Sequence, residues 1–144
     1  MEAELPLRII VNRPPPGVTF AVQKGRHGLL PPTRRTADEI AFDFSVRVGD
    51  RDGRPNFVGE YAQGTPADRF VYVNSGTGAG QMGSPWSRRA KVKLGTLTRE
   101  MVDAALDAGG VLEARIHGVG RDGGPACATV PLLDGGWRLA GDGR

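Results

Sequence analysis

The chain has 144 residues, of which 39% are hydrophobic, and it contains 22 glycines, 11 prolines and one cysteine. This length suits one domain, residues 1–144, with a core of its own, and the single cysteine excludes an internal disulfide and a zinc site built from several cysteines. A net charge of +3 does not by itself indicate nucleic-acid binding. The sequence has no apolar run long enough to cross a membrane and no export signal at its start, so we expect a soluble cytoplasmic protein of a bacterium.

Two short strands are predicted first, over residues 5–11 and 18–22, because apolar residues occupy alternate positions in both segments. Three consecutive prolines and Gly17 separate them, and these residue types favour an extended segment followed by a turn. Residues 25–36 contain two adjacent prolines and three arginines, and we expect a loop there.

The clearest strand pattern lies at residues 39–49, whose apolar face consists of Ile40, Phe42, Phe44, Val46 and Val48. Asp52-Gly53 follows as a hairpin turn, since both residue types tolerate a positive φ, and a return strand is expected at 57–62. Residues 69–74 form another predicted strand, which is apolar on both faces and is therefore expected at the centre of a sheet.

Residues 88–94 alternate again, with the cations Arg89, Lys91 and Lys93 on one face. One helix is predicted after this strand, because Thr98 is a favourable N-cap and Gly109 a favourable C-terminal stop. Three further strands are expected, at residues 111–119, 126–132 and 136–139.

About eight or nine short strands joined by glycine-rich turns, together with one helix, predict a mainly β fold. We expect an antiparallel β-sandwich or β-barrel, with the helix closing one end. The edge strands of an open sandwich make a homodimer a further prediction.

The segment between the strands at 69–74 and 88–94 contains Gly78, Gly80 and Gly83, at the spacing of a dinucleotide-binding loop. Such a loop needs a helix after the glycines, whose N-terminal amides face the pyrophosphate. Here a β-type alternation follows instead, so no nucleotide cofactor is expected. The glycines form either an ordinary hairpin connection or a small nest of backbone amides that binds an anion.

The same segment supplies the candidate binding site. An aromatic ring beside two arginines, as at Trp86, is an arrangement that binds sugars, single-stranded nucleic acids or aromatic acids; the alternative is that Trp86 plugs the end of the sandwich. We expect the ligand-binding residues to be Gly76, Gly78, Gly80, Gln81, Trp86, Arg88, Arg89 and Lys91. The ligand would be a small anionic or sugar-like molecule, or an acidic protein partner.

Patterns for catalysis and metal binding are weaker. His27, His117 and Cys127 show no metal-ligand spacing, and no metal is expected. Cys127 lies among small apolar residues and is expected to be buried, although a nucleophilic pairing with His117 stays open. The alternative function is a small enzyme that uses Asp43 or His117 as acid or base in the mouth of the sandwich, and the second alternative is weak nucleic-acid binding.

Longer strings of the sequence carry a family resemblance: RPPPGV, RFVYVN, RRAK and DGGPACATVPLLDGGW. On these strings the chain, from Arg8 to Trp137, resembles an uncharacterised bacterial family known only as a domain of unknown function. The resemblance implies a single cytoplasmic domain and transfers no activity, substrate or catalytic residue. From the cations that converge beside one aromatic residue, and not from the resemblance, we expect a non-enzymatic binding module with its site at the glycine-rich turn and the cationic strand.

Overall fold

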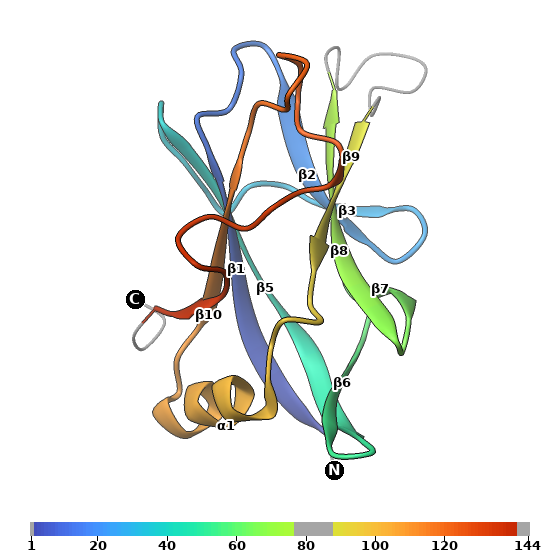
Figure 1. Ribbon diagram of the computed structural model, residues 1–144. Coiled ribbons are helices and arrows are strands. Elements are labelled where there is room, and N and C mark those ends of the chain that lie inside the picture. The colour runs from blue at the N-terminus through green and yellow to red at the C-terminus, as the bar shows by residue number, and fades with distance from the viewer. Residues whose placement is uncertain (1, 77–87, 141–144) are drawn as a thin grey trace.

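The computed structural model describes residues 2–76 and 88–140. Two six-stranded sheets pack face to face, and Figure 1 shows their strands running along the length of the molecule. Of the two architectures that the sequence predicts, the chain adopts the sandwich.

Sheet A is built around two long neighbouring strands. Its order is β12 (Arg138–Leu139), β10 (Leu112–His117), β1 (Ala3–Asn12), β5 (Glu39–Arg51) and β4 (Arg34–Arg35), and β6 (Arg54–Val58) pairs with the far end of β5. Sheet B has the order β11 (Ala128–Thr129), β9 (Arg88–Lys93), β8 (Asp68–Gly76), β2 (Thr19–Lys24) and β3 (Gly28–Leu30), and β7 (Gln63–Thr65) pairs with β8. β8 occupies the central position that its two apolar faces predict.

The core lies between the sheets and consists of the alternating apolar residues. The predicted inward face of β5 is buried, and Ile40, Phe42 and Val46 are at most 2% exposed. The neighbouring strands contribute further core side chains, among them Leu7, Ile9, Val22, Val71, Val73, Val92, Leu112 and Ile116. A slip of one residue in any of these strands would turn its apolar set toward water, so the alternation fixes the register as well as the fold.

Twelve strands are present in the described residues, against the eight or nine predicted. The additional strands, β3, β4 and β7, have only two or three residues each, which is too short to give an alternating pattern. β3 and β4 lie in residues 25–36, for which the sequence predicts a loop, and they pair with the longer strands β2 and β5.

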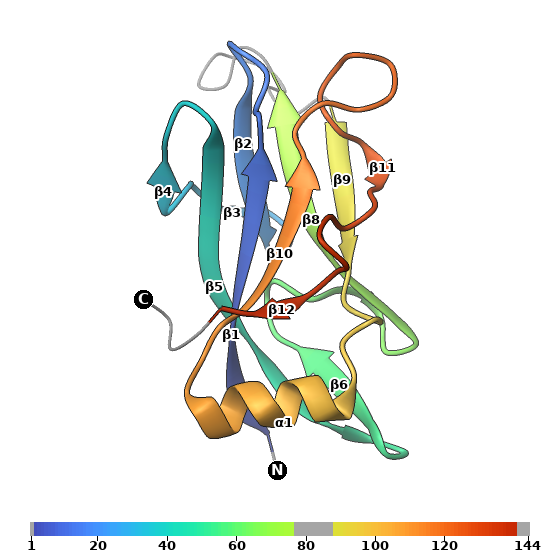
Figure 2. The ribbon, with the colours of Figure 1, turned by 60° about the vertical axis from the view of Figure 1, so that its left-hand side comes forward.

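Two pairings, β1 with β10 and β9 with β11, are parallel, and the others are antiparallel as predicted. The chain passes from β9 of sheet B to β10 of sheet A through helix α1 (Arg99–Ala108). Figure 2 shows α1 lying across one end of the sandwich, beside β6. This crossing brings β10 into sheet A next to β1 and in the same direction.

Helix α1 begins and ends where the sequence predicts. Thr98 Oγ1 accepts a hydrogen bond from the backbone N–H of Met101 at 3.2 Å, and Gly109 ends the helix with a φ of 62°. Val102 and Ala105 are buried against the core. The helix has ten residues, and no helix in the described ranges has the length or the apolar composition to cross a membrane.

Candidate functional site

Half of the predicted binding residues fall within the structure. Outside the described residues lie Gly78, Gly80, Gln81 and Trp86. Gly76 is the last residue of β8, where it is buried and pairs with Thr19 of β2. Gly76 is therefore part of the regular sheet.

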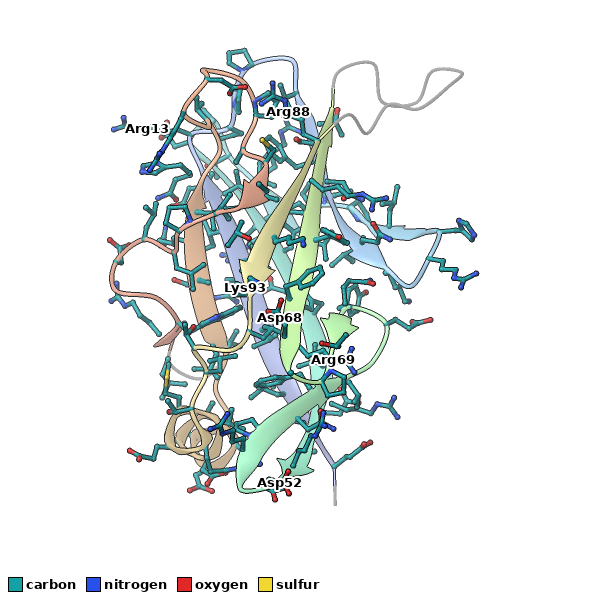
Figure 3. All side chains as sticks on the ribbon, turned by 45° about the vertical axis from the view of Figure 1, so that its right-hand side comes forward. Arg13, Asp52, Asp68, Arg69, Arg88 and Lys93 are labelled. Carbon is teal, nitrogen blue, oxygen red and sulfur yellow. The ribbon has the colours of Figure 1, made fainter. Side chains whose placement is uncertain are left out.

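Arg88 and Arg89 point to opposite sides of sheet B, because neighbouring residues of a strand alternate between its faces. Arg88 Nη1 lies 2.9 Å from Asp122 Oδ2 and 3.0 Å from the carbonyl oxygen of Pro125. The hydrogen bond to Asp122 raises the pKa of Arg88, and the pKa of Asp122 is lowered because its carboxylate accepts hydrogen bonds from the backbone N–H of Gly124 and from Arg88. Arg88 thus holds a turn near the end of the sandwich, where Figure 3 labels it.

The outer face of sheet B carries a row of three cations on β9, Arg89, Lys91 and Lys93, which we call the cationic ladder. Each cation lies over an aromatic ring of β8. Arg89 Cζ is 5.0 Å from the centre of the Tyr72 ring, and the Nζ atoms of Lys91 and Lys93 are 4.6 and 5.6 Å from the centre of the Phe70 ring. Cation–π attraction therefore favours these positions of the side chains.

The three cations of the ladder differ in how far they are neutralised. Lys93 Nζ lies 2.7 Å from Asp68 Oδ1, and Figure 3 shows the two residues side by side. Arg89 and Lys91 form no ion pair within residues 2–76 and 88–140. Two of the predicted binding residues thus lie on the same face of β9.

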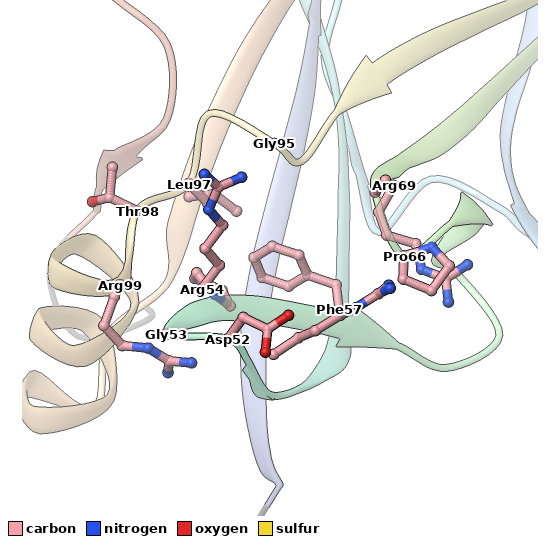
Figure 4. A pocket seen from close by; sticks show the side chains of 13 residues that line it. Asp52, Gly53, Arg54, Phe57, Pro66, Arg69, Gly95, Leu97, Thr98 and Arg99 are labelled. Atoms are coloured by element: carbon pink, nitrogen blue, oxygen red, sulfur yellow. The ribbon is translucent and has the colours of Figure 1, made fainter.

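A pocket of about 720 Å³ opens beside α1, at the C-terminal end of β5. We call it the arginine pocket, because four arginines from three parts of the chain line it: Arg51 and Arg54 on the β5–β6 hairpin, Arg69 near the start of β8, and Arg99 at the start of α1. Figure 4 shows Arg54 and Arg99 on one side of Phe57, and Arg69 on the other.

The sequence contains one signal for the arginine pocket, which our prediction of the site missed. Arg51 and Arg54 flank the predicted Asp52-Gly53 turn, so the hairpin brings them face to face. The turn forms as predicted, with φ of 52° at Asp52 and 80° at Gly53. The other two arginines reach the pocket only through the packing of β8 and α1 against this hairpin, which no local pattern reveals.

A second cavity, of about 510 Å³, is lined by His117 and Cys127 among other residues. Cys127 is exposed, so the prediction that it is buried is wrong. The next residue, Ala128, has a φ of 59°, and β11 has only two residues, so a regular alternation does not run through Cys127. The two members of the His–Cys pair that the sequence leaves open therefore line one cavity.

Asp43, the other acid or base candidate, lies on the outer face of sheet A. Its Oδ1 accepts a hydrogen bond from Arg8 Nε at 2.6 Å, and it lines neither of the two cavities. Within the described part of the chain, no three His, Cys, Asp or Glu side chains lie together as the ligands of a metal ion would.

No curated protein and no solved structure matches this chain at a significant level. A family model described as "Family of unknown function (DUF5990)" matches residues 5–140, which is nearly the whole chain. The match includes the strings that carry the resemblance in the sequence. The chain belongs to this family of unknown function.

Proposed function

We propose that the protein is a non-enzymatic binding module whose cationic ladder takes an acidic segment of a partner protein. One observation carries the proposal: Arg89 and Lys91 lie over aromatic rings and form no ion pair within the described residues. Positive charges held at an open surface attract a negatively charged partner and favour one orientation of it.

The central arginines of sheet A differ from the cations of the ladder. On the outer face of sheet A, Arg8 lies 2.6 Å from Asp43, and Arg115 lies 2.6 Å from Glu39. The charges of those arginines are balanced by carboxylates within the fold. Among the described residues, Arg89 and Lys91 of β9 have no carboxylate partner, and neither have the exposed Arg34 and Arg35 of β4 in sheet A. The ladder differs from these two arginines by the aromatic rings of β8 beneath its cations.

An extended segment suits the ladder better than a small molecule does. Side chains on one face of a strand recur about every 6.8 Å, so acidic residues at alternate positions of an extended segment would meet Arg89 and Lys91 in register. Neither residue lines one of the two cavities, and small ligands bind in concave sites.

The aromatic rings of the ladder favour an acidic peptide over a nucleic acid or a sugar. Lys91 and Lys93 both lie over Phe70, which is 7% exposed, and Arg89 lies over Tyr72. A base or sugar that stacks needs a free ring face, and these faces are already covered by cations. A sugar-like ligand at Trp86 stays a prediction.

The test uses a fluorescently labelled peptide of alternating glutamate and threonine and a second peptide of the same composition in two blocks. We expect the alternating peptide to bind more tightly in fluorescence anisotropy. Arg89→Ala combined with Lys91→Ala should weaken its binding about five- to tenfold, the effect of losing two exposed charge contacts. Binding should also weaken as salt is added, because salt screens exposed charges.

The matched control is Arg34→Ala combined with Arg35→Ala, which removes the same charge from exposed positions of β4 in sheet A. The proposal fails if both double variants lose the same affinity, since the attraction then follows net charge alone. It also fails if a single-stranded oligonucleotide binds the ladder more tightly than the alternating peptide, a result that would favour the nucleic-acid alternative.

The enzyme alternative depends on His117, which lines the smaller cavity together with Cys127. A bacterial, cytoplasmic setting and a homodimer stay predictions. The strands at the ends of the two sheets, β4 and β12 in sheet A and β3 and β11 in sheet B, have only two or three residues each. Such short strands offer little backbone for pairing with a second copy; β6, which has five residues and pairs with β5 alone among the described strands, offers a longer edge.

A further inference from the structure

We propose that the arginine pocket is a second binding site, which takes a small phosphate monoester with an apolar body. The pocket shares no residue with the cationic ladder, so this inference does not depend on the function proposed above. It rests on an unfavourable pair of like charges, on two arginines that the fold holds in place, and on a partly apolar lining.

The like charges are those of Arg51 and Arg54, which are direct partners in the β5–β6 pairing. The Cβ atoms of directly opposite residues are about 5 Å apart, and like-charged side chains at such a pair of positions are unfavourable. Both arginines line the pocket and form no ion pair within the described portion of the chain. An oxyanion bound between them would relieve this repulsion.

The fold holds the other two arginines in place. Arg99 Nη2 donates hydrogen bonds to the carbonyl oxygen of Gly49 at 2.9 Å and to Asp50 Oδ1 at 3.0 Å, which fixes its guanidinium beside the hairpin. Arg69 Nη1 donates to the carbonyl oxygen of Gly64 at 2.5 Å. Side chains that are positioned before binding lose less conformational entropy when a ligand arrives.

The charge of the pocket suits a phosphate. Four arginines and one aspartate, Asp52, line it. The charge of Arg99 is already met by ion pairs with Asp50 at 3.0 Å and Asp103 at 3.7 Å. The other three arginines and Asp52 therefore leave a formal charge of +2. The pocket also includes Thr98 and Arg99 at the N-terminal end of α1, where the helix dipole adds partial positive charge. Arginine forks bind phosphate oxygens in pairs, and a doubly charged phosphate balances this lining better than a singly charged carboxylate.

Part of the pocket lining is apolar, and this determines which kind of group the phosphate should carry. Its solvent-facing apolar surface comes from Pro66 and Ala67, which are exposed, and from the half-buried Pro55. Phe57 and Leu97 also line the pocket but are only 4% and 3% exposed, and Figure 4 shows the Phe57 ring between the arginines. An inorganic ion would leave this surface in contact with water, whereas an apolar group attached to the phosphate would cover it. A volume of about 720 Å³ is also typical of sites for small organic ligands.

The test compares phenyl phosphate, inorganic phosphate and benzoate by titration calorimetry on the whole chain. We expect phenyl phosphate to bind most tightly, because inorganic phosphate lacks the apolar body and benzoate carries a single charge. Arg54→Gln should weaken phenyl phosphate binding about tenfold or more, the effect of losing a charge-assisted hydrogen bond.

A second readout separates a binding arginine from a structural one. Because Arg54→Gln removes the repulsion with Arg51, the free variant should melt at the same temperature as the native protein or higher. The rise in melting temperature that phenyl phosphate causes should become smaller at the same time. A structural arginine would instead lower the melting temperature of the free protein when it is replaced.

Arg35→Gln, at an exposed position of β4, is the control and should bind phenyl phosphate as the native protein does. The proposal is overturned if Arg54→Gln keeps its full affinity, if Arg35→Gln loses as much, or if phenyl phosphate binds no more tightly than inorganic phosphate. If Arg54→Gln does not fold, Arg51→Gln removes the other half of the like-charged pair and makes the same test.

Discussion

Arg8 Nε of β1 and Asp43 Oδ1 of β5 lie 2.6 Å apart on the outer face of sheet A, and the Arg8 side chain is 8% exposed. Glu113 of β10 approaches the same guanidinium, with its Oε2 3.4 Å from Arg8 Nη1. Because β1 lies between β5 and β10, one arginine joins three strands. A charge that leaves water on folding depends on its partners for compensation.

Replacement of Asp43 by alanine should therefore destabilise the fold. We expect the free energy of unfolding to fall by about 2 kcal/mol, because the buried guanidinium loses its nearest carboxylate while Glu113 remains. Urea denaturation followed by circular dichroism measures the change. Glu60→Ala is the control: Glu60 forms an exposed pair with Lys24 at 3.6 Å, and its loss should cost about 0.5 kcal/mol or less. Equal losses in the two variants would contradict the role given to Arg8.

The strands that could be predicted from the sequence are those whose burial alternates over many residues. β5 is the clearest case, because the two faces of its 13 residues meet different surroundings, the core and solvent. β3 and β4 could not be predicted, because they exist only through pairing with β2 and β5. The parallel pairing of β1 with β10 could not be predicted either, because it joins segments about a hundred residues apart. Its direction depends on the path that the chain takes through α1.

The same distinction holds for the candidate sites. The shared face of Arg89 and Lys91 follows from their spacing along one strand, and so could be predicted. The aromatic rings beneath them come from β8, and their position depends on the register between two strands. The arginine pocket combines residues of β5, β6, β8 and α1, so it becomes visible only once these elements are packed together.

The turn that Arg88 holds offers a direct titration test. We expect the pKa of Asp122 in the folded protein to lie below its ordinary value, because the carboxylate accepts hydrogen bonds from the backbone N–H of Gly124 and from Arg88. In Arg88→Gln this pKa should rise without reaching the ordinary value, since the bond from Gly124 remains. Carbon-detected NMR of the aspartate carboxyls measures both values.

The sign of the effect on stability follows from this lowered pKa. The contribution of Asp122 is fully present above the pKa of the unfolded chain and is lost as the pH falls through the lower pKa of the folded protein. The difference in the free energy of unfolding between the native protein and Arg88→Gln should therefore shrink as the pH falls through the pKa of Asp122 in the folded protein. A pKa of Asp122 at or above its ordinary value in the native protein would contradict the contacts at this turn.

Gly64 of β7 should be sensitive to replacement by alanine for two reasons. Its φ is +88°, which strains any residue with a Cβ, and an added methyl group would clash with the backbone carbonyl oxygen of Asp68 and would also lie 2.7 Å from Cε2 of Phe70, the ring over which Lys91 lies. We expect a loss of about 2 kcal/mol or more in the free energy of unfolding, together with weaker binding of the alternating acidic peptide.

Gly53→Ala is the matched control for Gly64→Ala. Gly53 has a similar φ of +80°, but an added methyl group would meet nothing within 4 Å. Its replacement should cost only the backbone strain, about 1 kcal/mol, and leave peptide binding unchanged. If the two alanine variants lose the same stability and bind the acidic peptide equally well, the close approach of Gly64 to Phe70 is not needed to hold the Phe70 ring beneath Lys91.

Trp137 joins the end of the chain to sheet B. Its side chain is 5% exposed, and Nε1 donates a hydrogen bond to the carbonyl oxygen of Lys93, the last residue of β9, at 3.1 Å. The residues that follow form β12 in sheet A, so this one side chain links both sheets. Trp137→Phe keeps most of the apolar contact and should cost about 1–2 kcal/mol for the lost hydrogen bond, whereas Trp137→Ala should cost about 3–5 kcal/mol. Urea denaturation of both variants separates the two contributions, and a phenylalanine variant as stable as the native protein would mean that apolar contact alone holds the segment.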